Sequence, residues 1–182
     1  INFYDDLALV FSSKKISFFQ LRLKKETNLN KLIIGKKIKK ICNKYKVKFL
    51  INDDPLLAKK LNADGCHLGQ KDMDLIKARK ILKNKIIGVT CHNSINLAKR
   101  AIKDGANYLA FGAFYATKTK TVKYRASLTV LKSIKKITSL PIVAIGGIKF
   151  SNYKKLLLNK ANFLAISGYI WNNKKYKPLE AI

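Results

Sequence analysis

The stretch VKFLINDDPLLAKKLNADGCHLG (47–69) contains the pattern that decides the fold. A short apolar run, VKFLIN (47–52), is followed by a helix-like segment, Pro55–Leu61, and then by a second strand-like run, GCHLG (65–69). Asp54 and Pro55 indicate a helix start, because a capping carboxylate and a proline at the first helical position both favour initiation. A strand, a helix and a strand in this order predict two parallel strands joined by a crossover helix.

The same alternation continues along the chain, and no linker or change of composition divides it. Strands are also expected in the runs 16–23, 86–91, 108–114, 141–147 and 163–168. Apolar residues at helical spacing predict helices at Phe3–Ser12, Leu29–Tyr45, Met73–Leu82, Ser94–Lys103, Ser127–Ile137 and Ser151–Asn159, three of which begin at a serine suited to capping. This alternation predicts an α/β fold with a parallel sheet.

The order and number of the strands favour a barrel. Seven strands are expected, and the helix Phe3–Ser12 precedes the first of them, whereas a (β/α)8 TIM barrel begins with a strand and usually exceeds about 200 residues. The 182-residue chain begins with Ile1. We therefore expect an α/β (β/α)8 TIM barrel, a single domain over 1–182, that lacks its first strand at the N-terminus and is unstable without it. An open doubly wound sheet is the alternative, and it needs no missing strand.

The chain is strongly basic, with 38 Lys and Arg residues against 10 Asp and Glu and a formal net charge of +28. Such a charge is typical of nucleic-acid-binding proteins. However, only four of the basic residues are arginine, and the lysines are spread over every expected helix without an aromatic ladder. We therefore expect solvated, lysine-rich helix faces and no nucleic-acid partner. A non-catalytic, basic RNA-binding protein is kept as an alternative.

No stretch predicts export or a membrane anchor. The longest apolar tracts, such as PIVAIGGI (141–148), are far shorter than the roughly 18 residues that a membrane span needs. The first residues, INFYDDLALVF (1–11), carry two acids where a signal peptide carries positive charge. Cys42, Cys66 and Cys91 lack metal-binding spacing and are expected to be small core residues in a reducing compartment. We expect a cytoplasmic globular protein without a membrane partner.

Polar residues in the first expected strand suggest a diphosphate site. Gln20, Arg22 and Lys24 alternate in QLRLK (20–24), so a strand would place all three on one face. Two cations at a barrel mouth are costly unless an anion meets them. Arginine with lysine suits a diphosphate, because it combines a bidentate donor with a point charge. A polar edge strand with its charges in solvent is the alternative.

Acidic residues gather after the next two strands, where five of the ten acids lie between 53 and 74. Asp53 and Asp72 follow consecutive strands, so both are expected at the same end of the sheet. Two carboxylates together with phosphate oxygens suit Mg²⁺. Asp54 is expected to cap a helix and Asp74 to lie in a first helical turn. A second cap, for the Met73–Leu82 helix, is the alternative role of Asp72.

Later strands add hydroxyl groups and glycines near their ends. These are Thr90 in GVTCHN, the polar loop 117–120, the Gly146–Gly147 pair and Ser167–Gly168. With one strand missing upstream, the last two would follow the seventh and eighth barrel strands, where backbone N–H groups and a short helix commonly bind phosphate. His67 is expected to be a buried polar residue, and His92 a residue of the barrel mouth without an assigned role.

Taken together, these motifs resemble the thiamine-phosphate synthase family of TIM-barrel transferases. The matching motifs run in family order: QLRLK (20–24), INDDPLLAKKLNADGCHLGQKD (51–72), GVTCHN (88–93), GAFYATKTK (112–120), PIVAIGGI (141–148) and AISG (165–168). The resemblance implies Mg²⁺-dependent coupling of 4-amino-2-methyl-5-hydroxymethylpyrimidine diphosphate with a thiazole phosphate to give thiamine phosphate. Diphosphate leaves first, and the thiazole nitrogen then attacks the resulting pyrimidinylmethyl cation.

The resemblance also implies which residues form the site. The pyrimidine diphosphate would be bound by Gln20, Leu21, Arg22, Leu23, Lys24, Asn52, Thr90 and Lys120, with Thr90 standing where the family usually has serine. The thiazole phosphate would be bound by Thr117, Lys118, Thr119, Gly147, Ile166 and Ser167, and the metal by Asp53 and Asp72. Ala113 and Ala116 replace two prolines of the family's loop, which predicts a looser loop.

Two further alternatives stay open. A related branch of the same fold isomerises the thiazole phosphate, has a histidine where this chain has Ala113, and has less need of the diphosphate and metal residues. A non-catalytic remnant would result if the first strand were absent in the cell. Small-molecule substrates are the expected partners, and a homodimer remains an open possibility.

Overall fold

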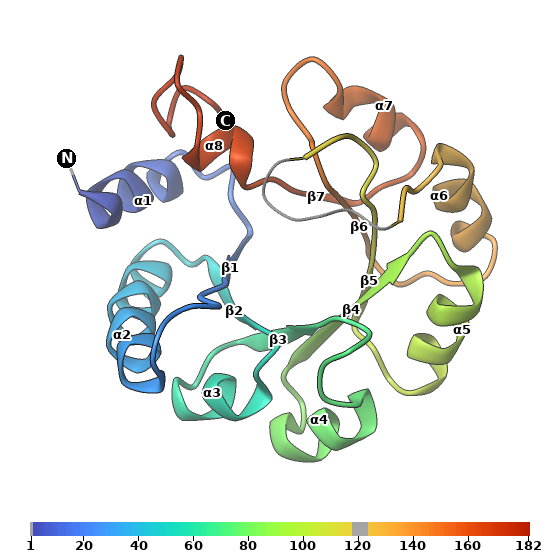
Figure 1. The fold of residues 1–182 in the computed structure, drawn as a ribbon, viewed down its shortest axis with the longest axis horizontal. Coiled ribbons are helices and arrows are strands. Elements are labelled where there is room, and N and C mark those ends of the chain that lie inside the picture. The colour runs from blue at the N-terminus through green and yellow to red at the C-terminus, as the bar shows by residue number, and fades with distance from the viewer. Residues whose placement is uncertain (1, 118–123) are drawn as a thin grey trace. The chain divides into compact units, whose positions relative to one another are not determined.

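The computed structural model describes residues 2–117 and 124–182 (Figure 1). These residues form two compact units. The first runs to Ile87 and takes in Pro178–Glu180 and Ile182, and the second contains Gly88–Lys177 and Ala181.

The first unit alternates helices with three parallel strands. Its elements are α1 (Phe3–Ser12), β1 (Phe18–Leu21), α2 (Asn28–Lys44), β2 (Lys48–Asn52), α3 (Pro55–Lys60), β3 (Gly65–Leu68) and α4 (Leu75–Leu82). β1 pairs with β2 in the register Phe18↔Lys48, and β2 pairs with β3 in the register Leu50↔Gly65. Within this unit, α2, α3 and α4 lie on the same side of the strands (Figure 1).

The second unit repeats the arrangement. β4 (Ile86–His92) leads into it and is followed by α5 (Ile95–Lys103), β5 (Tyr108–Phe111), α6 (Leu128–Lys135), β6 (Ile142–Ile145), α7 (Tyr153–Leu158), β7 (Phe163–Ala165) and α8 (Gly168–Trp171). β4, β5, β6 and β7 pair in parallel in sequence order, through Gly88↔Tyr108, Leu109↔Ile142 and Val143↔Phe163. Neighbouring strands therefore follow one another in both units, without the reversal of strand order that defines a doubly wound sheet.

The sequence predicted each of these seven strands, but several boundaries differ. β1 ends at Leu21, so Arg22 and Lys24 lie beyond the strand, and the expectation that one strand face carries Gln20, Arg22 and Lys24 is wrong. The loop that follows turns toward α2, whose N-cap is Thr27. The four-residue helix α8 was not expected from the sequence.

Helix starts were predicted with mixed success. Asp54 caps α3 by accepting a hydrogen bond from the Leu57 N–H at 2.9 Å, and Ser94 caps α5 by accepting one from the Leu97 N–H at 3.2 Å. Ser127 precedes α6 but makes no capping bond. The expected cap at Ser151 is wrong, because α7 begins one residue later and its N-cap position is Asn152.

The buried side chains of the helices are mostly apolar. In α1 the buried side chains are Leu7, Val10 and Phe11, and the Phe11 ring lies 5.7 Å from the Phe19 ring in an edge-on arrangement. Cys42, Cys66 and Cys91 are buried core residues, as predicted. Among the described residues, none of the helices has the length and apolar character needed to cross a membrane.

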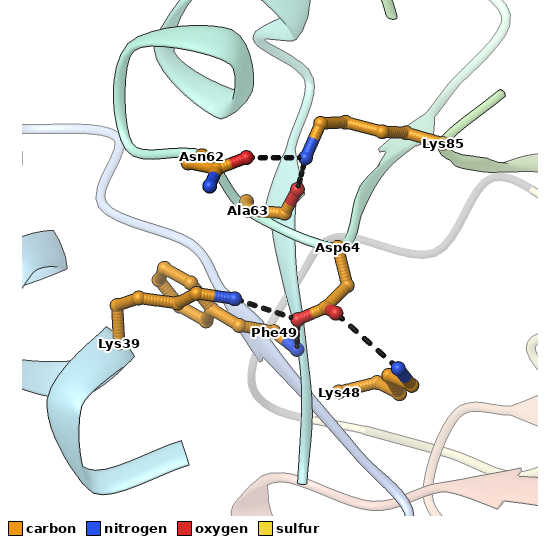
Figure 2. A network of polar contacts seen from close by, with 7 residues as sticks. All are labelled: Lys39, Lys48, Phe49, Asn62, Ala63, Asp64 and Lys85. Carbon is orange, nitrogen blue, oxygen red and sulfur yellow. Dashed lines mark hydrogen bonds and ion pairs between the residues drawn. The ribbon is translucent and has the colours of Figure 1, made fainter. Parts of the chain in front are cut away.

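Asp64 joins three elements at the amino end of β3 (Figure 2). Its Oδ2 accepts hydrogen bonds from Lys39 Nζ and the Phe49 N–H, both at 2.9 Å, and its Oδ1 lies 3.5 Å from Lys48 Nζ. Beside it, Lys85 Nζ donates to Asn62 Oδ1 at 2.7 Å and to the Ala63 carbonyl at 2.6 Å. Partial burial would raise the pKa of Asp64, but the Phe49 N–H and the two ammonium groups outweigh it and hold the pKa below its usual value.

We expect Asp64→Asn to lower the free energy of unfolding by about 1 kcal/mol at neutral pH, because it removes two charge-assisted partners but keeps an acceptor for the Phe49 N–H. A lowered pKa stabilises the fold above the unfolded value of about 3.9, and this contribution is lost as the pH falls through the folded pKa. Urea unfolding from about pH 7 to pH 3 should therefore show the difference from wild type shrinking. Asp104→Asn is the control, since Asp104 makes no ion pair in the described part of the chain. If the difference in free energy of unfolding between wild type and Asp64→Asn stayed constant from about pH 7 to pH 3, the lowered pKa of Asp64 would be contradicted.

Candidate active site

The carboxyl ends of β1 and β2 bring two predicted residues into contact. Gln20 pairs with Leu50 in the sheet, so Asn52, two residues further along β2, lies on the same face. The Gln20 Nε2 donates a hydrogen bond of 2.6 Å to Asn52 Oδ1. This bond orients both amides, and within residues 2–117 and 124–182 the Asn52 amino group and the Gln20 oxygen make no other hydrogen bond.

Lys24 reaches back to this end of the sheet from beyond β1. Its Nζ lies 3.5 Å from Asp53 Oδ2, and its side chain is 56% exposed against 29% for Asp53. Arg22 is also exposed. Both cations therefore border solvent at the end of the sheet, where a phosphate group can displace water from them at little cost.

Asp53 and Asp72 lie together, as predicted. Asp53 has a positive φ of 66°, and its N–H donates to the His67 carbonyl at 2.8 Å, which ties it to β3. Asp72 Oδ2 accepts a hydrogen bond of 2.7 Å from the Gly69 N–H. Burial, followed by a hydrogen bond to the Asp72 carboxyl and its charge, raises the pKa of Asp53, and Lys24 opposes this shift.

The two neighbouring carboxylates have the donor chemistry of a Mg²⁺ site. Two like charges in contact favour a shared proton or a bound cation. The part of the chain that the structure describes contains no cluster of three or more His, Cys, Asp or Glu side chains that could hold a metal ion. Mg²⁺ is compatible with this set, because it commonly binds to one or two carboxylates and completes its shell with water and substrate phosphate.

The other two acids of this segment have structural roles. Asp54 caps α3, as noted, and Asp74 Oδ1 accepts hydrogen bonds from the N–H groups of Ile76 and Lys77, at 2.9 and 3.3 Å. Asp74 is thus the N-cap of α4 rather than a residue of its first turn. Because Asp74 caps α4, the alternative role of Asp72 as a helix cap is wrong.

In the second unit, the loop after β5 is fastened to the end of β4. The His92 and Tyr124 rings lie 4.5 Å apart at 33°, and the Ser127 N–H donates to Asn93 Oδ1 at 3.1 Å. The Ala113 N–H donates to the Tyr124 carbonyl at 3.2 Å, a bond that proline could not make. Alanine in place of the family's proline therefore allows one additional backbone hydrogen bond, between Ala113 and Tyr124. Tyr124 was missed from the sequence, because nothing in KYRAS indicates that the chain returns to Ala113 there.

The same loop is fastened on its other side to β6. The Phe114 N–H donates to the Ile145 carbonyl and the Tyr115 N–H to the Gly146 carbonyl, both at 3.1 Å. A Cβ at Gly147, whose φ is 64°, would collide with the Ala116 carbonyl oxygen. Glycine is therefore required here both by the backbone conformation and by the close approach of the loop.

The remaining predicted residues are placed as follows. Thr90 and Thr117 are half-buried, as is Ile166 just after β7, and Ser167 is exposed at the start of α8. Leu21 is buried in β1 and Leu23 is half-buried. Lys118, Thr119 and Lys120 lie outside the described residues. His67 is 7% exposed, as expected of a buried polar residue.

The family model, the sequence relatives and one solved structure point to the same family. Residues 4–170 match the family model described as thiamine monophosphate synthase. A thiamine-phosphate synthase of Pelagibacter ubique (strain HTCC1062) is 97% identical over 182 residues, which is 100% of this chain and 88% of that protein. One from Marinobacter nauticus is 42% identical over 156 residues, 85% of this chain and 70% of that protein. The solved structure of thiamine phosphate pyrophosphorylase from Pyrococcus furiosus superposes with a TM-score of 0.87 at 26% identity and covers 99% of this chain and 85% of its own.

Parallel strands that alternate with helices, together with the superposition on thiamine phosphate pyrophosphorylase, define a fold of the TIM-barrel class, and the family match makes the chain a transferase of that class. Within that class, the chain belongs to the thiamine monophosphate synthase family.

The three cysteine thiols are free and buried. Burial raises the pKa of Cys42, Cys66 and Cys91 to about 12, so each is a protonated thiol at physiological pH. We expect the folded protein to react with an aromatic disulfide reagent near pH 8 far more slowly than the protein unfolded in guanidinium, in which all three thiols react. Stoichiometric reaction of the folded protein within minutes would contradict their burial.

Proposed function

We propose that the chain is a thiamine-phosphate synthase that couples a hydroxymethylpyrimidine diphosphate with a thiazole phosphate and releases diphosphate. The observation that carries the proposal is 97% identity over all 182 residues to a protein of that name. The contact of Gln20 with Asn52 and the grouping of Lys24, Asp53 and Asp72 support it, because these are the residues from which the resemblance predicts the diphosphate and metal sites.

The pyrimidine diphosphate is held, on this proposal, mainly by the first unit. Arg22 and Lys24 neutralise the diphosphate, while the paired amides of Gln20 and Asn52 orient it. Leu21 and Leu23 contribute through their backbone. Thr90 supplies a hydroxyl to the pyrimidine amine, and Lys120 adds a further cation to the diphosphate.

Asp53 and Asp72 would hold Mg²⁺. The ion, when bound, supplies charge neutralisation of the leaving diphosphate. The role of the two side chains is to provide adjacent anionic oxygens, and Lys24 balances part of their charge in the free enzyme.

The thiazole phosphate is held, on this proposal, by the second unit. Thr117 and Thr119 donate hydroxyls and Lys118 adds a charge, while Gly147, Ile166 and Ser167 provide backbone N–H groups and a hydroxyl. Backbone N–H groups suit a phosphate, because they are fixed donors that carry no competing countercharge.

The chemistry is a dissociative substitution. Diphosphate leaves the methylene carbon of the pyrimidine with the bonding electron pair, and the electron-rich aminopyrimidine ring stabilises the cation that remains. The thiazole nitrogen then gives its lone pair to that carbon. The protein supplies neither nucleophile nor strong base, and it accelerates the reaction by neutralising the leaving group and orienting two substrates.

Ala113 favours coupling over isomerisation of the thiazole phosphate. The isomerising branch has a histidine at this position, whereas an alanine side chain can neither accept nor donate a proton. Incubation of the purified protein with both substrates and Mg²⁺ tests the proposal, with thiamine phosphate as the measured product. Conversion of the thiazole phosphate to a tautomer without coupling would overturn it.

Metal dependence follows from the carboxylate pair. We expect chelation to abolish turnover and Asp53→Asn to raise the Mg²⁺ concentration needed for half-maximal activity at least about tenfold, because one anionic ligand is lost. Asp54→Ala is the matched control, since it removes a helix cap worth about 1 kcal/mol of stability but no proposed ligand. Equal activity of Asp53→Asn and wild type at limiting Mg²⁺ would exclude the assignment.

Interactions with the leaving group should act most strongly in the transition state. We therefore expect Arg22→Ala and Lys120→Ala to lower kcat as well as affinity for the pyrimidine diphosphate, each by roughly tenfold or more. Lys25→Ala is a suitable control, because Lys25 is exposed, adjacent to the site and has no proposed role. Normal kcat in both variants would show that these cations do not contact the leaving diphosphate.

A further inference from the structure

Asn152 uses its side chain in an unusual way for a residue at a helix N-cap. It occupies that position in α7, yet its side chain makes no capping bond to the helix. Instead, its Nδ2 donates to the Gly147 carbonyl at 3.1 Å and its Oδ1 accepts from the Lys149 N–H at 2.9 Å. A capping bond is worth about 1 kcal/mol, so this amide is directed to the loop before the helix at the expense of the helix itself.

Tyr115 completes the same arrangement from the loop after β5. Its hydroxyl donates to the Asn152 carbonyl at 3.0 Å, and its N–H donates to the Gly146 carbonyl at 3.1 Å. Both glycine carbonyls are therefore held, Gly146 by the Tyr115 backbone and Gly147 by the Asn152 amide.

These two bonds also fix the direction of two N–H groups. In a planar trans peptide the N–H points opposite to the carbonyl of the preceding residue. Holding the carbonyls of Gly146 and Gly147 therefore directs the N–H groups of Gly147 and Ile148 to the other side of the turn. Within the described residues, neither N–H donates a hydrogen bond to the protein. Gly146 and Gly147 both have positive φ, and consecutive N–H groups that point the same way in such a turn form a donor pair that suits an anion.

We propose that Asn152, supported by Tyr115, is a positioning residue that presents the Gly147 and Ile148 N–H groups to the phosphate of the thiazole substrate. The proposal rests on the proposed function for the identity of that substrate. On this proposal Asn152 does not contact the substrate itself. Asn152 keeps the peptide groups of the turn from rotating. The turn is therefore ordered before the phosphate binds, and binding does not have to offset the entropic cost of ordering it.

The test is Asn152→Ala, examined by steady-state kinetics with both substrates and by calorimetric binding of the thiazole phosphate alone. We expect KM and Kd for the thiazole phosphate to rise roughly tenfold, because two hydrogen bonds that order the turn are lost. The KM for the pyrimidine diphosphate and kcat at saturating thiazole phosphate should stay within about twofold of wild type. Asn159→Ala is the matched control, since Asn159 also donates its amide to a backbone carbonyl, that of Lys155, but at the other end of α7.

Two further variants keep the proposal falsifiable if Asn152→Ala fails to fold. Tyr115→Phe removes only the hydroxyl and should weaken thiazole phosphate binding about threefold. Asn152→Asp keeps the acceptor for the Lys149 N–H but loses the donor to Gly147, and it should bind as weakly as the alanine variant. Unchanged binding in a folded Asn152 variant, or equal loss of both substrates, would overturn the proposal. If the wild-type protein does not couple the substrates, the proposed function fails, and binding of inorganic phosphate by wild type and variants still decides the role of Asn152.

Discussion

Parallel pairing of consecutive strands is the constraint on which the chemistry of each unit depends. Parallel strands all end on the same edge, so residues far apart in sequence become neighbours without any specific attraction between them. Gln20 and Asn52 meet because the register Gln20↔Leu50 places them one pleat apart on adjacent strands. The loops after β5 and β6 meet for the same reason, through Phe114 with Ile145 and Tyr115 with Gly146.

Acidic residues at the two ends of the strands have different electrostatic surroundings. Asp64, at the amino end of β3, is saturated by two ammonium groups and a backbone N–H, so its pKa is lowered. Asp53, at the carboxyl end of β2, faces another carboxylate, so its pKa is raised. In a chain of net charge +28, the ion pairs of Asp64 stabilise the fold. The repulsion between Asp53 and Asp72, in contrast, favours the binding of a cation between them.

The sequence predicted what periodicity and short-range chemistry determine. Each strand, the exact extent of α1 and the cap at Asp54 follow from apolar spacing and local hydrogen bonding. The contact of Asp53 with Asp72 also followed from their positions after successive strands. Contacts that depend on a returning loop could not be predicted, which is why Tyr124 and the bonds of Tyr115 were missed. Ser151 was chosen as a cap on residue type alone, whereas the boundary of α7 is fixed by the bonds of Asn152 to the preceding turn.

The unusual use of the Asn152 amide has a consequence for local unfolding. α7 has six residues, buries only Leu156 and begins without a side-chain cap, so little besides the adjacent turn holds it. Short, uncapped helices open at far lower free energy than the whole fold. Amide exchange in α7 should thus proceed through fraying of the helix, while the turn before it remains ordered by tertiary bonds. A rigid turn followed by a soft helix therefore separates the two motions, so that opening of α7 leaves the backbone at Gly147 in place.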